Sequence, residues 1–335
     1  MVLSVVLFLL CAAAIYLACE YFVNGVEWVG RRLGIGATAT GTVLAAFGTA
    51  LPESAVTFVA VVFGRNTAQK EIGVGAAVGG PLVLSTISYA VVGVALCYSV
   101  HKLRRPNTEL QLDTRRLSGD QAWFLLIFIV ALALGLESFP LKRWLGVVLF
   151  GAYALYVWRE MTAGHGGEHD DEQLEPLKFR PKNPSLVWAS LQTLTALLVI
   201  AVASHTFVGQ LETIGAHLGI SPQLVALLLS PVATELPETL NALIWVRQGR
   251  ERLALANISG AMMIQATVPA GLGMLFTTWR FDPPLVIAAF TATAAVVLLW
   301  LMFRRPRVSG ISLVPLGLLY VLFAIAVAFF QRGSV

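Results

Sequence analysis

Two glutamates stand in the middle of long apolar segments and share the same local pattern. One ends the run Thr49-Ala-Leu-Pro-Glu53, and the other ends the run Thr234-Glu-Leu-Pro-Glu238. A carboxylate at the centre of a bilayer costs about 2.5–3.5 kcal/mol on insertion scales. A proline also removes a hydrogen-bond donor from a helix. Because carboxylates and freed backbone carbonyls are good cation ligands, the pattern predicts that Glu53 and Glu238 bind a metal cation inside a membrane.

The composition explains why lipid is the expected solvent. Apolar residues make up 57% of the 335 residues and charged residues only 13%. This balance is far from that of a soluble domain and predicts an all-α polytopic protein of the cell (inner) membrane. The expected partners are the lipid bilayer and inorganic cations. The sequence predicts no nucleic-acid contact, no protein partner, no cofactor and no enzymatic activity.

The apolar segments predict ten transmembrane helices, each near the length that crosses a hydrocarbon core of about 30 Å. The first is read as a retained span, because it lacks the basic start and the cleavage site of a signal peptide. We expect the spans at roughly 2–25, 36–63, 72–98, 121–137, 142–161, 186–208, 220–246, 253–278, 283–303 and 310–330.

A polar stretch over residues 162–185 separates the fifth span from the sixth. Its charges and glycines are expected to keep it out of the protein interior, as a cytoplasmic linker between a first repeat at 1–161 and a second at 186–335. His165 and His169 stand among acidic residues in this stretch. That composition fits either a metal sensor or a plain solvated loop.

The basic residues predict the orientation of the spans. With the N-terminus outside, most of the 23 Lys and Arg residues fall in the inner connections, so both termini are expected to be extracytoplasmic. Five spans per half is an odd number, and the two halves therefore cross the membrane in opposite directions as inverted repeats. The Pro-Glu breaks then place broken helices 2 and 7 together near the midplane.

The similarity of the halves continues beyond the breaks. Residues 73–81 are rich in glycine and correspond to residues 254–262, which are also mostly small. Small residues let membrane helices approach closely. We expect these segments to pack tightly around the midplane and to leave room for an occluded ion.

The paired motif resembles that of the calcium/cation antiporters, which include the sodium/calcium exchangers. That family carries Gly-Thr-Ser-x-Pro-Glu in its second and seventh spans, and here the corresponding residues begin at Gly48 and Ala233. Residues 256–261 look like a worn version of the family's second signature in the eighth span. The resemblance implies a ten-helix exchanger fold and secondary active cation transport by alternating access, with Ca²⁺ leaving the cytoplasm against Na⁺ or H⁺.

Carried over by position, the resemblance assigns Glu53 and Glu238 to the family's two acidic ligands. Thr49 and Thr234 match positions whose carbonyl and hydroxyl oxygens line the ion site. Several positions depart from the family pattern: the third span has Ala76, Gly80 and Leu84 where the family has polar residues, the eighth has Ala261 and Gln265, and the seventh has Glu235 in place of serine.

These departures change the expected ion preference. Calcium takes six to eight oxygens at about 2.3–2.6 Å, which the two glutamates, the threonine carbonyls, Gln265 and water can supply. Separate cages for several sodium ions are poorer. Glu235 adds a third acid, and crowded buried carboxylates favour protons, so we expect Glu235, Gln265 and Asn257 to form a proton or additional cation site. The alternatives are a helix-end contact for Glu235 and simple interhelical hydrogen bonds for the two amides.

Three other classes of function stay open. A cation channel could use the same acids as a selectivity ring, although the two-fold relation here lies within one chain. A membrane protein that binds cations without transporting them is another. An intramembrane enzyme is disfavoured, because the sequence has neither His-Glu-x-x-His nor Gly-x-Ser-x-Gly.

Overall fold

The structure is a computed structural model of the chain. It describes residues 1–33, 51–99, 108–110, 114–137, 141–162, 176–179 and 184–333. Over these residues the regular structure is helical, and the only β contact is an isolated bridge between Glu109 and Ser309. The predicted all-α architecture is confirmed for this part of the chain.

Seven of the described helical segments are long and apolar enough to cross a membrane. They are α1 (Val2–Arg32), α3 with η1 and α4 (Thr67–Val83, Leu84–Ser88 and Tyr89–Ser99), α5 (Thr114–Leu136), α7 (Leu186–Leu218), α10 (Glu251–Phe276), α11 (Pro283–Phe303) and η3 with α12 (Gly310–Leu313 and Leu316–Gly333). The other helices are Leu51–Val62, η2 (Lys142–Trp144) with α6 (Leu145–Thr162), α8 (Pro222–Thr234) and α9 (Leu236–Arg247). The first part of the predicted second span, residues 36–50, lies outside the described residues.

Polar residues between the helices set where several of them begin. The side chain of Asn66 accepts a hydrogen bond from the backbone N–H of Gln69 at 2.8 Å and caps α3, and Ser221 caps α8 in the same way. Asn66 and Gln69 also donate 2.8 Å hydrogen bonds to Glu212 of α7. α7 ends at Gly219, whose φ of 66° suits glycine. These contacts fasten α7 to the start of α3.

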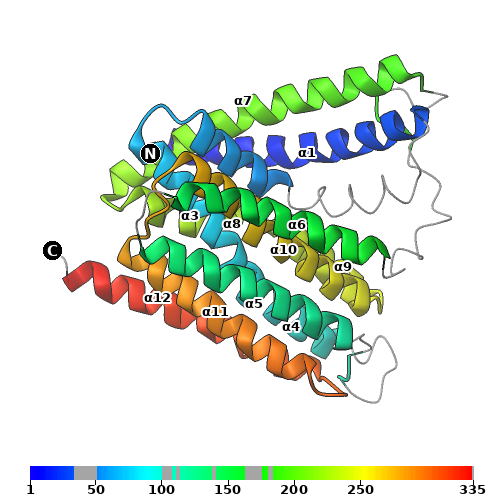
Figure 1. The fold of residues 1–335 in the computed structure, drawn as a ribbon, viewed down its shortest axis with the longest axis vertical. Helices are drawn as coiled ribbons and strands as arrows, with labels where there is room; N and C mark the ends of the chain where they lie inside the picture. Colours follow the sequence, from blue (N-terminus) through cyan, green and yellow to red (C-terminus); the bar gives the residue numbers. More distant parts are fainter. Residues whose placement is uncertain are drawn as a thin grey trace.

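The helices α1 and α7 form a long pair along one side of the bundle (Figure 1). The rings of Phe8 and Phe207 stack with their centroids 4.7 Å apart, and Gly25 lies against Thr193. The pair contacts the remaining helices through α3, α8 and the helix Leu51–Val62.

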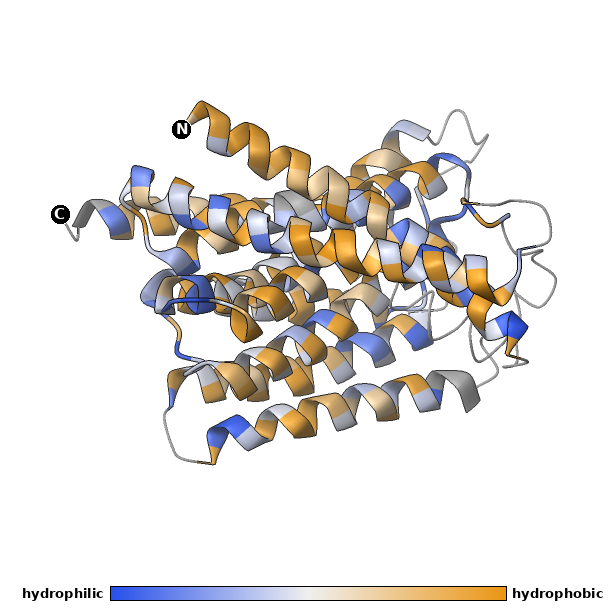
Figure 2. Ribbon diagram, turned by 90° about the horizontal axis from the view of Figure 1, so that it is seen from above, coloured by the Kyte–Doolittle hydropathy of each residue, from blue (hydrophilic) through white to orange (hydrophobic). Residues whose placement is uncertain are grey.

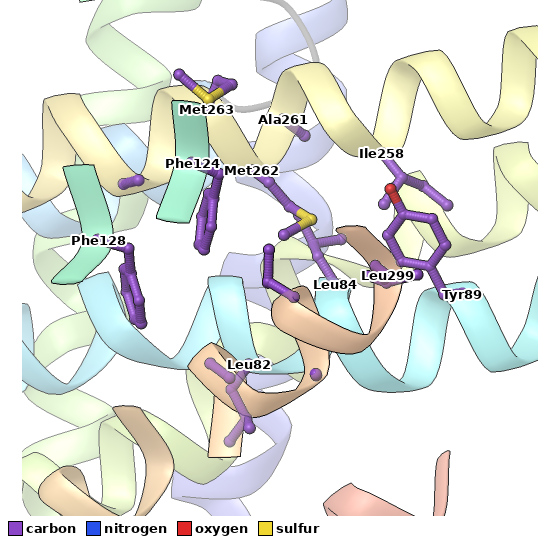
Figure 3. Close-up of a cluster of buried hydrophobic side chains, with 14 of the residues drawn as sticks. Leu82, Leu84, Tyr89, Phe124, Phe128, Ile258, Ala261, Met262, Met263 and Leu299 are labelled. Carbon is purple, nitrogen blue, oxygen red and sulfur yellow. The ribbon is translucent and has the colours of Figure 1, made fainter. Parts of the chain in front are cut away.

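The main apolar core lies where the first half of the chain meets the second (Figure 3). Leu84 and Tyr89 are fully buried beside Ile258 and Met262 of α10 and Leu299 of α11. α10 packs on α5 and α6, and in the same manner α11 and α12 pack on the α3–η1–α4 segment. This exchange of equivalent contacts supports the predicted relation between the two repeats.

The helices are mostly apolar along their lengths, as Figure 2 shows, and many of their large apolar side chains are exposed. Leu10, Leu198 and Phe329 are 60%, 64% and 70% exposed, respectively. Water would not tolerate so many large apolar side chains on one surface, whereas lipid does. The chain is a multi-pass membrane protein.

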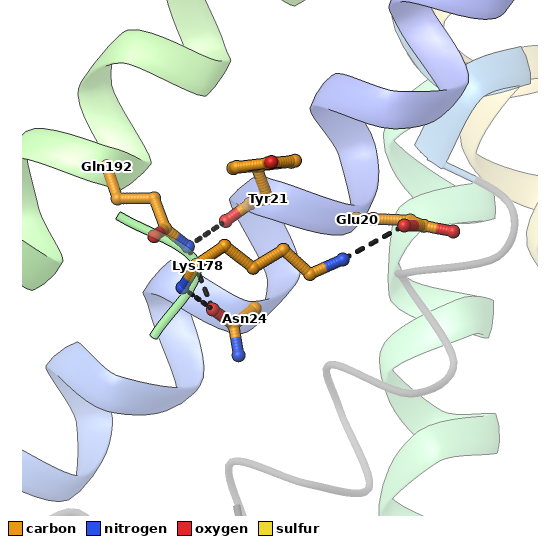
Figure 4. Close-up of polar contacts among 5 residues, drawn as sticks. All are labelled: Glu20, Tyr21, Asn24, Lys178 and Gln192. Carbon is orange, nitrogen blue, oxygen red and sulfur yellow. Dashed lines mark hydrogen bonds and ion pairs between the residues drawn. The ribbon is translucent and has the colours of Figure 1, made fainter. Parts of the chain in front are cut away.

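One residue of the predicted linker, Leu177, is buried, contrary to the expectation for the stretch, while its described neighbours Pro176, Lys178 and Phe179 are exposed. In the segment 176–179, which we name the strap, Leu177 is fully buried. The strap binds α1 and α7 (Figure 4): Lys178 forms a 2.9 Å ion pair with Glu20, and its N–H donates to Asn24. Burial of the apolar Leu177 side chain favours binding of the strap. The average composition of the whole linker, which is polar, does not reveal this single apolar contact. The rest of the linker's His- and acid-rich part, residues 163–175, lies outside the described residues.

Gln192 of α7 holds the strap in place and provides a test of it. Its Oε1 accepts the N–H of Phe179 at 2.8 Å, and its Nε2 donates to the carbonyl of Tyr21 and to Asn24 at 2.9 Å. Gln192→Leu would remove all three hydrogen bonds of this fully buried side chain, so we expect a loss of about 2 kcal/mol or more. A lowered melting temperature of the purified protein would show it. Gln248→Leu, at an exposed glutamine after α9, should melt like the wild type.

Candidate cation site

The predicted break in the seventh span is present. α8 ends at Thr234, α9 begins at Leu236, and Glu235 lies at the junction. Pro237 has no N–H to donate to the carbonyl of Ala233 one turn earlier. The helix is therefore interrupted directly beside two glutamates, Glu235 and Glu238. The corresponding turn before Pro52 involves residues outside the described part of the chain.

Glycines of α3 bring the elements of the site close together. Gly73 contacts the helix Leu51–Val62, which carries Glu53, while Gly75 and Gly79 contact α8. A Cβ atom at Gly75 would lie only 2.2 Å from the carbonyl oxygen of Gln223. Only glycine fits at such a backbone approach. The close packing expected of residues 73–81 is thus found against α8 and its neighbours.

The helix α3 then changes its winding next to the site. Pro81 lies inside the helix, and the π-helical turn η1 follows it at once. π-turns are rare and frequently occur at functional sites. The hydroxyls of Ser88 and Thr239 form a 2.7 Å hydrogen bond between the end of η1 and α9. This hydrogen bond joins the π-helical turn to the helix that carries Glu238.

Glu53 meets the α8–α9 junction through a shared hydroxyl. Thr234 Oγ1 lies 2.5 Å from Glu53 Oε2 and 3.0 Å from Glu235 Oε1, and all three side chains are at most 3% exposed. A hydroxyl has only one hydrogen to donate. Its contact with the second carboxylate is favourable only when a proton or a cation is also present. The arrangement is suited to binding positive charge.

Buried polar atoms without hydrogen-bond partners gather around the same point. Native proteins leave few such atoms, so their concentration in one place indicates a binding site. Within the described residues they include Glu53 Oε1, Ser54 Oγ, Thr57 Oγ1, Ser230 Oγ, Glu235 Oε2, Glu238 Oε2 and both amide atoms of Gln265. Asn257 Nδ2, two turns from Gln265 on α10, is a further such atom. Most are oxygens, the ligand type that alkaline-earth cations prefer.

Gln265 closes the site on the side of α10. It is fully buried, and its Oε1 lies 2.7 Å from where a Cβ atom on Gly80 would stand. The missing side chain at Gly80, predicted to weaken the sodium sites, therefore leaves room for the Gln265 amide. Asn257 lies two turns earlier on α10 and is half-buried. The ligand roles of Gln265 and Asn257 stay predictions.

Glu238 occupies the first turn of α9 and is 2% exposed. It lies within electrostatic reach of Glu53 and Glu235 and also of Cys19 on α1. The sequence pattern set Glu53 opposite Glu238, whereas the direct link from Glu53 runs through Thr234 to Glu235. Glu238 therefore extends the site from this link toward the α1–α7 pair.

The described residues do not form a ready-made metal cage of acidic side chains. No group of three or more His, Cys, Asp or Glu among them is placed to hold one metal ion. Thr49, a predicted ligand, lies outside the described residues. A cation here would need a mixed set of carboxylate, hydroxyl, amide and carbonyl oxygens. The assignments of Glu53, Glu238, Thr49 and Thr234 as ligands stay predictions.

Three hydroxyl residues of the site were not found from the sequence. Thr57 lies one helical turn after Glu53, and Ser230 lies one turn before Thr234. Both side chains are buried near the Glu53 carboxylate, and Ser54 stands next to it in the chain. The spacing of four residues from a predicted ligand was the signal that would have identified Thr57 and Ser230.

Apolar helices enclosing buried carboxylates at a proline break define an ion-transporting membrane protein, and comparisons with known proteins agree. The chain is 25% identical over 319 residues to the putative antiporter CaxA of Alkalimonas amylolytica, which covers 92% of this chain and 94% of CaxA. It is 27% identical over 258 residues to the inner membrane protein YrbG of Escherichia coli, covering 76% and 74% of the two chains.

Solved structures share the fold. The H⁺/Ca²⁺ exchanger CAX superposes with a TM-score of 0.73 at 18% identity, covering 96% of this chain and 82% of CAX. The sodium-calcium exchanger NCX_Mj gives a TM-score of 0.58 at 21% identity, covering 97% and 99%. A family model described as sodium/calcium exchanger protein matches residues 3–161 and 188–331. The chain belongs to this family and is a membrane antiporter of cations.

Proposed function

We propose that this antiporter exports Ca²⁺, or a related divalent cation, in exchange for protons. The observation that carries the proposal is the single Thr234 hydroxyl held between the buried carboxylates of Glu53 and Glu235. Two ionised carboxylates that share one hydroxyl in a low-dielectric site are stable together only with added positive charge. Either a divalent cation or protons can supply it. Sodium is the alternative counter-ion.

Competition for the same oxygens would couple the two ions. Calcium binds ionised carboxylates, so its arrival releases protons, and protonation in turn expels calcium. Glu53 and Glu238 are proposed as the acidic ligands, and Thr49 and Thr234 as donors of carbonyl and hydroxyl oxygens. Glu235, with Gln265 and Asn257, would form the proton or additional cation site. The H⁺/Ca²⁺ exchange named for CAX supports this choice.

Sodium coupling is less well supported by the oxygens available. Ala76, Gly80 and Leu84 provide no side-chain oxygen on α3 and η1, and the Gln265 amide lies against Gly80. Because these three positions lack polar side chains, the first repeat has fewer possible ligands than the second. The site can thus hold one divalent cation more readily than several monovalent ones.

Alternating access requires one part of the bundle to move past another. The α1–α7 pair meets the remaining helices at α3, α8 and the helix Leu51–Val62, and Glu238 lies toward this pair. We place both termini outside the cytoplasm and the chain in the inner membrane, from the distribution of basic residues. The proposed repeats are 1–161 and 186–335, with 162–185 as a cytoplasmic linker and broken helices 2 and 7 meeting at the midplane.

Gradient-driven uptake into proteoliposomes tests the proposal. We expect Ca²⁺ to enter vesicles that are acidic inside, without sodium on either side, and a protonophore to abolish this uptake. Empty liposomes provide the control. Uptake that needs an internal sodium load and resists the protonophore would replace H⁺ by Na⁺ as the counter-ion. Equal Ca²⁺ flux with no opposing gradient would favour a channel, and no flux with retained Ca²⁺ binding would leave a non-transporting protein.

A further inference from the structure

A groove on the outside of the bundle lies between α4, α9 and α12, away from the buried carboxylates. Its volume is about 380 Å³, within the range of sites that hold small molecules. Val91 and Val94 of α4, Leu243 of α9 and Gly317 of α12 form much of its apolar wall. The groove therefore has the size and surface to hold a hydrocarbon chain.

Small residues create the groove. Gly317 has no side chain, and a Cβ atom there would lie 3.1 Å from the Cβ of Ala90 on α4. The two helices therefore approach closely at the floor, while the larger Val94, which is 40% exposed, stands at the rim. At the end away from Tyr98, the groove reaches Ile87, next to the Ser88–Thr239 hydrogen bond.

Charge is confined to one end of the groove. Arg247, in the last turn of α9, is the one charged residue of the lining, and Tyr98 near the end of α4 is 85% exposed beside the same groove. Within the described residues, Arg247 has no acidic partner. An exposed arginine and a tyrosine at a helix end are typical of the level of the lipid headgroups. By the distribution of basic residues, this end faces the cytoplasm.

We propose that the groove binds an anionic phospholipid of the inner leaflet, with one acyl chain along α4 and α9 and the phosphate on Arg247. The groove opens on the lipid-facing surface, so a membrane lipid reaches it directly. The apolar wall matches the chain, and the guanidinium matches phosphate oxygens, which it binds through two parallel hydrogen bonds. A zwitterionic lipid has the same chains but no net charge to complement Arg247.

The position of the groove allows a bound lipid to influence the transport site through α9. Thr239 forms a hydrogen bond with Ser88 at the end of the groove away from Arg247, and it directly follows Glu238 in the chain. An acyl chain between α4 and α9 therefore packs against the helix that carries Glu238. Lipid binding itself does not depend on which ions the protein exchanges.

Native mass spectrometry of the full-length protein tests the site, with dioleoyl phosphatidylglycerol and dioleoyl phosphatidylcholine as competing probes. We expect the wild type to retain phosphatidylglycerol at least about fivefold better, and Arg247→Gln to lose this preference, since one basic residue near anionic lipid contributes about that factor. Arg247→Lys should keep part of it. Arg250→Gln, at an exposed arginine outside the groove, should behave like the wild type.

A second change tests the acyl-chain part of the site. Val94→Trp places a bulky side chain at the rim and should reduce retention of both lipids without lowering the melting temperature. The proposal is overturned if Arg247→Gln retains phosphatidylglycerol as the wild type does. It is also overturned if Val94→Trp, with wild-type melting, leaves the retention of both lipids unchanged. Transport by the same variants reports separately on the proposed exchange.

Discussion

Replacing Glu53 with glutamine is expected to reduce Ca²⁺ exchange by roughly 10- to 100-fold. The substitution keeps the shape of the side chain and leaves an oxygen that can accept the Thr234 hydroxyl, but it removes the negative charge. Loss of a charge-assisted contact of about 1.5–3 kcal/mol corresponds to a change of this size in binding. The measurement is acid-inside Ca²⁺ uptake into proteoliposomes at limiting Ca²⁺.

The design separates an ion-binding role from a structural one. If Glu53 binds the ion, Glu53→Gln should melt at or above the wild-type temperature, because a buried charge has been removed. Glu137→Gln changes an exposed acid after α5 and should transport normally. Uptake by Glu53→Gln at the wild-type rate, with Glu137→Gln also unchanged, would remove Glu53 from the site.

The second large effect concerns packing. Gly75→Ala should destabilise the protein by about 3 kcal/mol or more, because its new methyl group would meet the backbone of Gln223 at 2.2 Å and force α3 away from α8. Backbone atoms cannot rotate aside as a side chain does. We expect a lower melting temperature and a smaller monodisperse fraction in size-exclusion chromatography. Gly75→Leu should be more severe still.

A matched glycine distinguishes this packing effect from helix propensity. Gly209 of α7 has no atom within 4 Å of its would-be Cβ, so Gly209→Ala adds a methyl group to open space. It should leave stability unchanged or slightly raised, since alanine favours helix over glycine. Equal stability of Gly75→Ala and Gly209→Ala would mean that α3 and α8 can separate at no cost, contrary to the close approach described here.

Much of the architecture could be predicted because lipid restricts the choices. Apolar length identified the spans, and the proline at position 237 located the break between α8 and α9, since a missing N–H interrupts any helix. The glycines of α3 indicated close packing for the same direct reason. Each of these inferences depends on the chemistry of a short segment and requires no knowledge of what lies beside it.

The details of the site depend on neighbours distant in sequence and were harder to predict. The sequence set Glu238 opposite Glu53, whereas Glu235 is the residue that shares the Thr234 hydroxyl with Glu53, because the path of the chain through the break decides which acid turns inward. Gln265 could be placed against Gly80 only once α10 and α3 were packed together. The burial of Leu177 could not be predicted from its polar neighbours in the sequence. It depends on the binding of the strap to α1 and α7, which are distant in the chain.

The strap has a consequence for the direction of transport. Two equivalent halves would give an inward-open and an outward-open form of equal free energy, related by the two-fold axis between the halves. The strap attaches at only one end of the α1–α7 pair, where it contacts Glu20, Asn24 and Gln192. Its binding therefore adds to the stability of whichever form keeps that end closed. Such an exchanger would populate one of the two open forms more than the other at rest. Its transport rates in the two directions would then differ under equal and opposite gradients.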